Sequence, residues 1–260
     1  MSAAGKVYLV GAGPGDPELL TRKAERLLAI ADVVLHDALV SEGVLKLISP
    51  KAEIINVGKR AGHKLLTQEE INALLVSYGR TRKVVVRLKG GDPSIFGRAG
   101  EEISALRSAG IEYEVVPGVS SALAAAAVAG ISLTDRRVAS QIVFSTFSRG
   151  TDGHAMDWGC VTSTTTLVLF MPGADYADVS ERLLAGGLPA DIPCTIVSQA
   201  TSAQQQVRWT NVGKLGSEER LPAPALLIVG RVASQQVAEL CEAHWNARQA
   251  GQGMERDSVS

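Results

Sequence analysis

Cysteine, histidine and aromatic residues are all scarce in this chain. Among its 260 residues there are three cysteines and four histidines, and 4% of the residues are aromatic. Cysteines that are few, odd in number and far apart form no disulfide framework, so we expect reduced thiols and a cytoplasmic protein. The scattered histidines have no metal-ligand spacing, so no residue is predicted to bind a metal. The scarcity of aromatic residues, without a stacking motif among basic residues, argues against a nucleic-acid partner.

A strong net charge and long apolar runs are missing as well. The formal net charge is −1, so no global field draws the protein toward nucleic acid or an anionic membrane. The longest stretch of small apolar residues, 122–129, is far too short to cross a bilayer. The first six residues, Met1 to Lys6, lack the apolar core of a signal peptide. We therefore expect a globular protein without a membrane partner, in which any basic site is local.

The first half of the chain contains a regular alternation of strand and helix patterns. Runs typical of strands occupy residues 6–10, 33–35, 53–57, 83–88 and 113–116. Helical periods separate them, and one of these helices opens on the capping box Thr67-Gln68-Glu69-Glu70. A helix is also expected over residues 17–30. Strands that alternate with helices predict a parallel sheet with helices on both faces.

The second half has fewer helices for each strand, which favours a mixed sheet. Strand patterns cover residues 141–146, 165–171, 195–198, 206–210 and 225–229, and helices are expected over 176–185 and 232–247. The whole pattern predicts two α/β domains, residues 5–133 and 134–247, followed by a disordered tail, 248–260. Because ligands collect at domain junctions and at the carboxyl ends of strands, we expect the ligand cleft between the two domains.

Two glycine-rich turns that carry aspartate follow predicted strands. The first, Gly11-Ala12-Gly13-Pro14-Gly15-Asp16, departs from the dinucleotide fingerprint because Asp16 stands in place of the third glycine. Pro14 also removes an N–H group from the phosphate cradle. Either turn alone is compatible with a plain strand-to-helix connection. Together with Gly90-Gly91-Asp92-Pro93, the first turn suits a ligand that is cationic and polar and lacks phosphate, such as S-adenosylmethionine.

In these turns and beyond them the chain resembles the uroporphyrinogen-III C-methyltransferases of the tetrapyrrole methylase family. The matching segments are residues 10–17, 57–62, 68–72, 86–92, 95–98, 115–118 and 224–230, so that the likeness covers roughly residues 5–235. The resemblance implies a two-domain α/β fold, a homodimer, and S-adenosylmethionine bound in the cleft between the domains.

The resemblance also implies roles for individual residues. The positions that would line the donor site are Pro14, Gly90, Gly91, Asp92, Ile95, Ser120, Ser121, Met171 and Ala200. Asp37 and Lys59 fall where the family has its proposed proton acceptor and proton donor. Arg98 and Glu101 occupy positions associated with substrate handling, so Arg98 is counted among both the catalytic and the substrate-binding residues. Arg60 is a further candidate contact for the substrate's carboxylates.

The implied reaction is the methylation of uroporphyrinogen III at two positions, which gives precorrin-2 for sirohaem or cobalamin synthesis and leaves S-adenosylhomocysteine. Three alternatives stay open: a methyltransferase acting on a later precorrin, a ribosomal RNA methyltransferase of similar fold, and a protein that binds the donor without turnover. The chain has His36-Asp37-Ala38 where the family shows Tyr-Asp-Arg, and Thr146-Phe147-Ser148 where Thr-Gly-His is common. These departures bear on the choice of tetrapyrrole more than on the donor.

Methyl transfer to a pyrrole carbon requires positioning and a base. The carbon is already electron-rich, so no Ser–His or Cys–His nucleophile is needed, whereas a positioned base contributes about 10²–10⁴ in rate. Asp37, just after a strand, is the candidate base, and the alternative is a helix N-cap or a surface carboxylate. Arg98 can hold propionate or acetate groups in bidentate fashion, or it can pair with Glu101 or Glu102 on its own helix turn.

Overall fold

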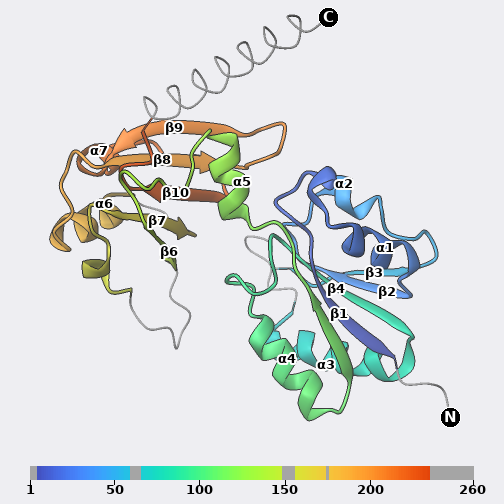
Figure 1. Cartoon of the computed structure of the whole chain (residues 1–260). Helices are drawn as coiled ribbons and strands as arrows, with labels where there is room; N and C mark the ends of the chain where they lie inside the picture. The colour runs from blue at the N-terminus through green and yellow to red at the C-terminus, as the bar shows by residue number, and fades with distance from the viewer. Residues whose placement is uncertain (1–4, 59–65, 148–155, 174–175, 235–260) are drawn as a thin grey trace, which may run out of the picture. The chain divides into compact units, whose positions relative to one another are not determined.

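The computed structural model describes residues 5–58, 66–147, 156–173 and 176–234 (Figure 1). Contacts between residues divide the chain into two units, Met1–Ser121 and Ala122–Ser260. The sequence pattern placed this division later in the chain, after residue 133. The helix of small residues that precedes residue 133 was therefore assigned to the first domain. The domain limits 5–133 and 134–247 stay predictions, and the expected tail, 248–260, lies outside the described residues.

The first unit contains a five-stranded sheet in which the strand order is β3-β2-β4-β1-β5. Its strands are β1 (Lys6–Gly11), β2 (Val33–His36), β3 (Glu53–Asn56), β4 (Val84–Lys89) and β5 (Glu112–Val116). All four neighbouring pairs are parallel, as the alternation of strands and helices predicted. Every residue of β2 is buried, which explains why the strand is an uninterrupted apolar run up to His36.

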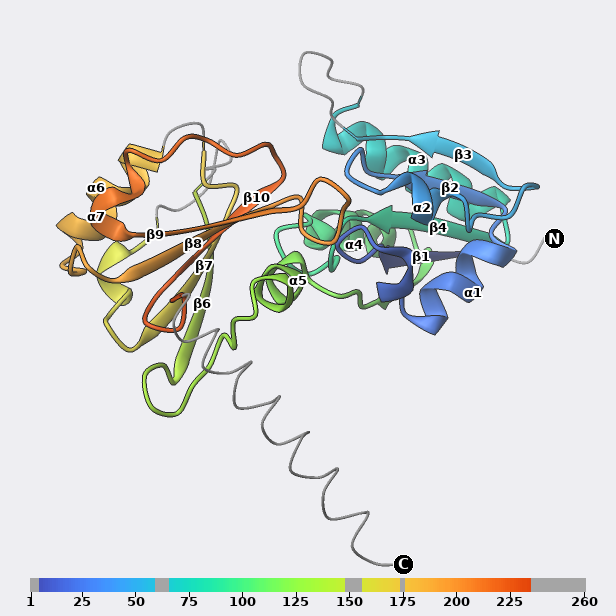
Figure 2. The same cartoon turned by 90° about the horizontal axis from the view of Figure 1, so that it is seen from above.

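Helices cover both faces of this sheet (Figure 1, Figure 2). The helical segments are η1 (Pro17–Leu19), α1 (Arg22–Ile30), α2 (Glu42–Leu45), α3 (Gln68–Thr81) and α4 (Ala99–Ser108). Successive strand residues point to opposite faces. Val34 therefore joins the core formed with α1 and α2, whereas Val33 joins the core formed with α3 and α4.

The single helix expected over residues 17–30 is in fact two segments. The Asp16 carboxylate accepts a hydrogen bond from the Glu18 N–H at 2.9 Å and caps a short 3₁₀ turn. The Thr21 hydroxyl then accepts from the Ala24 N–H at 3.1 Å and starts α1 at Arg22. The helical spacing of apolar residues runs through both segments. The sequence therefore showed no sign that a second helix begins after the cap at Thr21. The capping box predicted at Thr67 is confirmed.

The second unit contains a mixed sheet, also as predicted, in which the strand order is β6-β7-β10-β8-β9. The elements are α5 (Ser121–Val128), β6 (Gln141–Thr146), η2 (Trp158–Cys160), β7 (Thr165–Phe170), α6 (Tyr176–Ala185), β8 (Pro193–Ser198), β9 (Gln206–Asn211), α7 (Val212–Leu215) and β10 (Ala225–Val229). Only β6 and β7 pair in parallel. Residues 232–234 form no helix, and the rest of the helix expected from Val232 lies outside the described residues.

Candidate donor and substrate site

Loops that follow β1 and β4 are hydrogen-bonded to each other beyond the ends of their strands. The Ala12 N–H donates to the Lys89 carbonyl at 2.7 Å. Gly13 and Gly91 then exchange two hydrogen bonds, 3.2 Å from Gly13 N to Gly91 O and 2.8 Å from Gly91 N to Gly13 O. Because parallel strands end at the same edge of a sheet, the two aspartate-bearing turns singled out from the sequence are brought together there.

Glycine is required where these loops meet the loop after β5. A Cβ atom on Gly118 would lie 2.3 Å from the Gly91 carbonyl oxygen, and one on Gly11 would lie 2.6 Å from the Gly118 Cα atom. Neither distance is compatible with a side chain. At Gly11 and Gly118, the lack of a side chain lets one loop approach another.

Asp92 fastens the loop after β4 to the loop after β5. Its Oδ2 atom accepts a hydrogen bond from the Gly118 N–H at 2.9 Å, and its Oδ1 atom accepts from the Ser94 N–H at 2.8 Å and from the Ser94 hydroxyl. Burial alone would raise the pKa of Asp92, but these hydrogen bonds outweigh it and hold the pKa below its usual value. The carboxylate is thus engaged within the protein and shapes the loops.

Backbone N–H groups at this loop junction are also engaged. Those of Ala12, Gly13 and Gly91 donate to carbonyl groups, and that of Gly118 donates to Asp92. Pro14 has no N–H group. A phosphate cradle needs several free N–H groups that converge on an anion. These residues therefore favour a cationic or neutral ligand over a pyrophosphate.

The other predicted donor residues of the first unit follow the same strand ends. Gly90 precedes the Gly13–Gly91 bridge, and the Ile95 N–H donates to the Asp92 carbonyl at 3.2 Å. A Cβ atom on Gly91 would lie 3.5 Å from the Ser121 nitrogen and 4.0 Å from the Ser120 Cα atom. The structure therefore brings Pro14, Gly90, Gly91, Asp92, Ile95, Ser120 and Ser121 to one edge of the parallel sheet.

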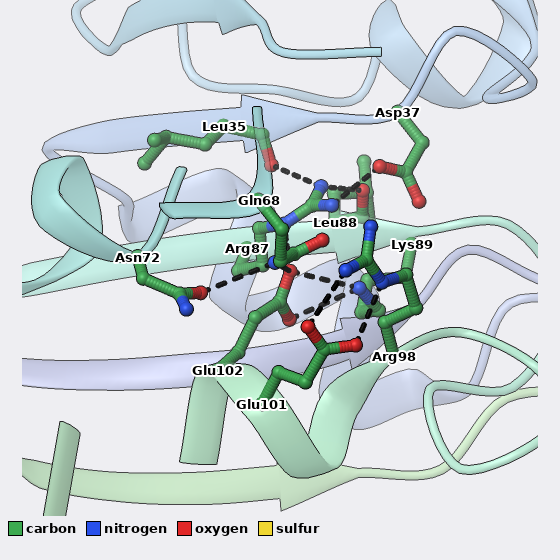
Figure 3. Close-up of polar contacts among 10 residues, drawn as sticks. All are labelled: Leu35, Asp37, Gln68, Asn72, Arg87, Leu88, Lys89, Arg98, Glu101 and Glu102. Atoms are coloured by element: carbon green, nitrogen blue, oxygen red, sulfur yellow. Dashed lines mark hydrogen bonds and ion pairs between the residues drawn. The ribbon is translucent and has the colours of Figure 1, made fainter. Parts of the chain in front are cut away.

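Asp37 lies at the same edge, directly after β2, and contacts a network of buried charges (Figure 3). The Arg87 Nη2 atom lies 2.5 Å from the Asp37 Oδ1 atom. The Arg87 Nε atom donates to Glu102 Oε1 at 2.9 Å, and the Lys89 Nζ atom lies 3.0 Å from both Glu102 oxygens. The side chains of Arg87, Lys89 and Glu102 are 3%, 2% and 0% exposed, against 31% for Asp37.

The network is balanced in charge, with two cations and two carboxylates. Burial would lower the pKa of Arg87, but the charges of Asp37 and Glu102 outweigh burial and raise it. For Lys89, burial and the neighbouring Arg87 lower the pKa in spite of Glu102. The amide nitrogen of Gln68 also donates to Glu102 at 3.3 Å. Buried charges are stable only when each is paired and hydrogen-bonded, as these are.

The sequence assigned no role to Arg87 or Lys89, and it offered Glu102 only as a possible partner of Arg98. A signal was present, because Arg87 and Lys89 stand two positions apart in a strand that is otherwise apolar. Lys and Arg are almost never fully buried unless they are paired, so their presence in a core strand indicates a buried partner. Which carboxylate is the partner depends on how α4 packs on the sheet.

Arg98 and Glu101 form an exposed ion pair at the start of α4. The Nε and Nη2 atoms of Arg98 each lie 2.7 Å from a Glu101 oxygen, and the side chains are 48% and 49% exposed. This is the pairing on one helix turn that the sequence left open as the alternative to a substrate contact. The neighbouring Arg98 guanidinium lowers the pKa of Glu101. Lys59 and Arg60 lie outside the described residues.

Met171 and Ala200 belong to the second unit and follow β7 and β8. Both strands are antiparallel to β10, so they run in the same direction and end at the same edge of the mixed sheet. The φ angle of Met171 is 48°, and those of Gln199 and Thr201, on either side of Ala200, are 47° and 68°. Three residues other than glycine in the left-handed region suggest a functional site at this edge.

Within the described ranges, no group of three His, Cys, Asp or Glu residues could hold a metal ion. In the same ranges, no helix is both long enough and apolar enough to span a membrane.

Comparisons with known proteins agree with this geometry. A uroporphyrinogen-III C-methyltransferase of Paracoccus denitrificans is 46% identical over 242 residues, which cover 91% of this chain and 84% of that protein. A siroheme synthase of Actinobacillus pleuropneumoniae is 45% identical over 89% of this chain but only 48% of its own length. The chain thus spans about half the length of that siroheme synthase.

A solved structure gives the same result. The uroporphyrin-III C-methyl transferase from Thermus thermophilus, complexed with S-adenyl homocysteine, matches with a TM-score of 0.77 and 41% identity over 88% of this chain and 98% of that one. The profile of the Tetrapyrrole (Corrin/Porphyrin) Methylases matches residues 6–216. With its parallel sheet, its mixed sheet and its joined glycine loops, this chain belongs to the tetrapyrrole methylase family.

Proposed function

We propose that this protein transfers the methyl group of S-adenosylmethionine to two carbon atoms of uroporphyrinogen III, which gives precorrin-2 and S-adenosylhomocysteine. The observation that carries the proposal is the junction of three glycine loops whose N–H groups donate to carbonyl groups and to Asp92, in a chain 46% identical to a uroporphyrinogen-III C-methyltransferase. Such a junction suits a sulfonium donor, and the Thermus relative was solved with S-adenyl homocysteine.

The proposal assigns donor binding to residues of the strand-end loops. They are Pro14, Gly90, Gly91, Asp92, Ile95, Ser120, Ser121, Met171 and Ala200. Carbonyl oxygens in such loops can orient the donor's methyl group through weak C–H···O contacts. Among the described residues, a Cβ atom on Gly90 would meet only Leu39, at 3.7 Å, so this backbone is open to a ligand.

In the proposed reaction, a pyrrole carbon attacks the methyl group while the carbon–sulfur bond breaks and its electron pair stays on sulfur. The macrocycle then loses a proton, and we assign the proton acceptor to Asp37, whose carboxylate is partly exposed at the sheet edge. Lys59 is the proposed proton donor. Arg98, Glu101 and Arg60 are the proposed substrate-handling residues: the two arginines supply cations for the carboxylates of the macrocycle, and Glu101 holds the Arg98 guanidinium.

The proposal includes a homodimer in the cytoplasm with no nucleic-acid or membrane partner. The family resemblance supports the homodimer. Because the formal net charge is only −1, the protein as a whole is not attracted to polyanions such as nucleic acid.

The test is anaerobic incubation of the protein with S-adenosylmethionine and uroporphyrinogen III, followed by mass analysis of the tetrapyrrole. Gain of two methyl groups is expected, and the Asp37→Asn variant should bind the donor but form product far more slowly. A folded protein that binds the donor and leaves uroporphyrinogen III unmethylated contradicts the proposal. In that case, methylation of a later precorrin or of ribosomal RNA identifies which alternative is correct.

A further inference from the structure

We infer that Arg87 is a positioning residue for Asp37: its buried guanidinium, held by Glu102, fixes one oxygen of the Asp37 carboxylate and leaves the other for the substrate's proton. The inference rests on the proposed role of Asp37 as proton acceptor. It assigns a task to the buried charges of β4 and α4, which the reaction itself does not otherwise use.

The guanidinium of Arg87 is held on three sides. Its Nε atom donates to Glu102 at 2.9 Å, its Nη1 atom donates to the Leu88 carbonyl at 3.2 Å, and its Nη2 atom lies 2.5 Å from Asp37 Oδ1. Arg87 pairs with Leu9 on one side and Leu35 on the other, in the middle of the sheet. A planar group that is held by Glu102 and the Leu88 carbonyl presents its Nη2 atom to Asp37 in one fixed direction.

Glu102 and Lys89 make this arrangement stable. Glu102 Oε1 accepts from Arg87, Lys89 and Gln68, and the Glu102 side chain is fully buried. Without Lys89, one guanidinium would face two carboxylates, and the excess negative charge in the interior would be costly. Lys89 supplies the second positive charge. Arg87 can therefore pair with both Glu102 and Asp37 without an excess of negative charge in the interior.

Asp37 is fixed on one side and open on the other. Its N–H donates to the Leu88 carbonyl at 3.1 Å, which anchors its backbone to β4. Its Oδ1 atom faces Arg87, whereas Oδ2 has no hydrogen bond to any described residue, and Figure 3 shows it directed away from the guanidinium. A carboxylate held in one orientation loses less entropy when it takes a proton from a bound substrate.

The experiment is a double-mutant cycle of Arg87→Lys and Asp37→Asn, with kcat and KM for uroporphyrinogen III and the Kd of S-adenosylhomocysteine measured for each variant. Lysine keeps the charge but loses the fork, so we expect Arg87→Lys to lower kcat about 10- to 100-fold and to leave the Kd unchanged. In the Asp37→Asn background, the same change should lower kcat by less than about twofold, because the group that Arg87 positions is already gone.

A purely structural role for Arg87 predicts a different result. If Arg87→Lys lowers kcat by the same factor in both backgrounds, the inference is overturned while the base role of Asp37 stands. If Asp37→Asn keeps full kcat, the base role fails and the inference fails with it. The control is Arg82→Lys, which alters an exposed ion pair with Glu53 at 3.3 Å and should leave kcat unchanged.

Thermal unfolding of each variant establishes that it is folded. If Arg87→Lys cannot be recovered in folded form, Glu102→Gln takes its place in the cycle, because glutamine has nearly the same shape but removes the negative charge that holds Arg87. The same non-additivity with Asp37→Asn is then expected, and additive losses would again overturn the inference.

Discussion

At the scale of single residues, the exposed pair of Arg98 and Glu101 leaves part of the guanidinium available. Two of its nitrogens face Glu101, and Nη1 has no hydrogen bond to any described residue. We predict that Arg98→Lys raises the KM for uroporphyrinogen III about 10- to 150-fold and leaves the Kd of the donor unchanged, because the loss of one charge-assisted hydrogen bond costs about 1.5–3 kcal/mol.

Steady-state kinetics with the tetrapyrrole and calorimetry with the donor check this prediction. The matched control is Arg107→Lys, since Arg107 is also exposed but contacts only the ring and hydroxyl of Tyr113 among the interactions that the structure gives it. An unchanged KM in Arg98→Lys would remove Arg98 from the substrate contacts.

Candidate site residues in a loop could be identified from the sequence, but ion pairs between residues far apart in the chain could not. Asp37 was found because it directly follows a strand pattern and matches the family. Arg87 and Glu102 were missed because they are 15 positions apart, and only the packing of α4 on the sheet joins them. Arg98 illustrates the opposite case, since its partner is three positions away and was considered from the sequence alone.

At the scale of elements, the strand-end loops depend on glycine for their mutual contact. We predict that Gly118→Ala lowers the free energy of unfolding by about 1–3 kcal/mol, because its Cβ would lie 2.3 Å from a backbone oxygen. Gly100→Ala is the control: this glycine is exposed in α4 and no atom of the described ranges lies within 4 Å of its Cβ position, so alanine should stabilise by about 0.5–1 kcal/mol. Urea titration of both variants measures the two effects, and an unaltered midpoint for Gly118→Ala would contradict the prediction.

Acid should weaken the contact between the loops after β4 and β5. The pKa of Asp92 lies below its ordinary 3.8, so between the lowered and the ordinary pKa the unfolded chain binds more protons than the folded one. The ionised Asp92 carboxylate therefore contributes its full stabilisation of the folded state above the ordinary pKa. This stabilisation is lost as the pH falls through the lowered pKa.

We predict that Asp92→Asn has a lower Tm than the wild type at neutral pH and that the difference shrinks as the pH falls below about 3.8. Scanning calorimetry across this range tests the prediction. A difference in Tm that does not depend on pH would show that the Asp92 charge contributes nothing to the contact.

Strands and their order of appearance could be predicted because burial on both faces leaves an apolar run, as in β2 and β4. Helix starts were less certain. Thr67 was recognised from its capping box, whereas Thr21 was overlooked because its hydroxyl caps α1 within a continuous apolar period. The short helix α2, Glu42–Leu45, was missed because four residues are too few to show a period.

At the scale of the whole molecule, the family was identified from several short sequence motifs. Each motif alone is weak evidence for a family, but their joint occurrence is specific. The match of residues 6–216 to the family and of 84% of the Paracoccus protein confirms that identification. The siroheme synthase is matched over 48% of its own length, so only the methyl transfer is proposed for this chain.

The homodimer remains a prediction at this scale. We expect light scattering to give twice the chain mass of 27.3 kDa at micromolar concentration. A mass equal to that of one chain, for protein that methylates uroporphyrinogen III, would show that one copy is sufficient for activity.

The two hydrogen bonds exchanged by Gly13 and Gly91 have a consequence for competition among adenosine compounds. ATP shares its adenosine moiety with the methyl donor but carries a triphosphate, and at this junction the triphosphate would meet carbonyl groups and an ionised Asp92. Adding ATP to the methylation assay should therefore slow the proposed reaction little.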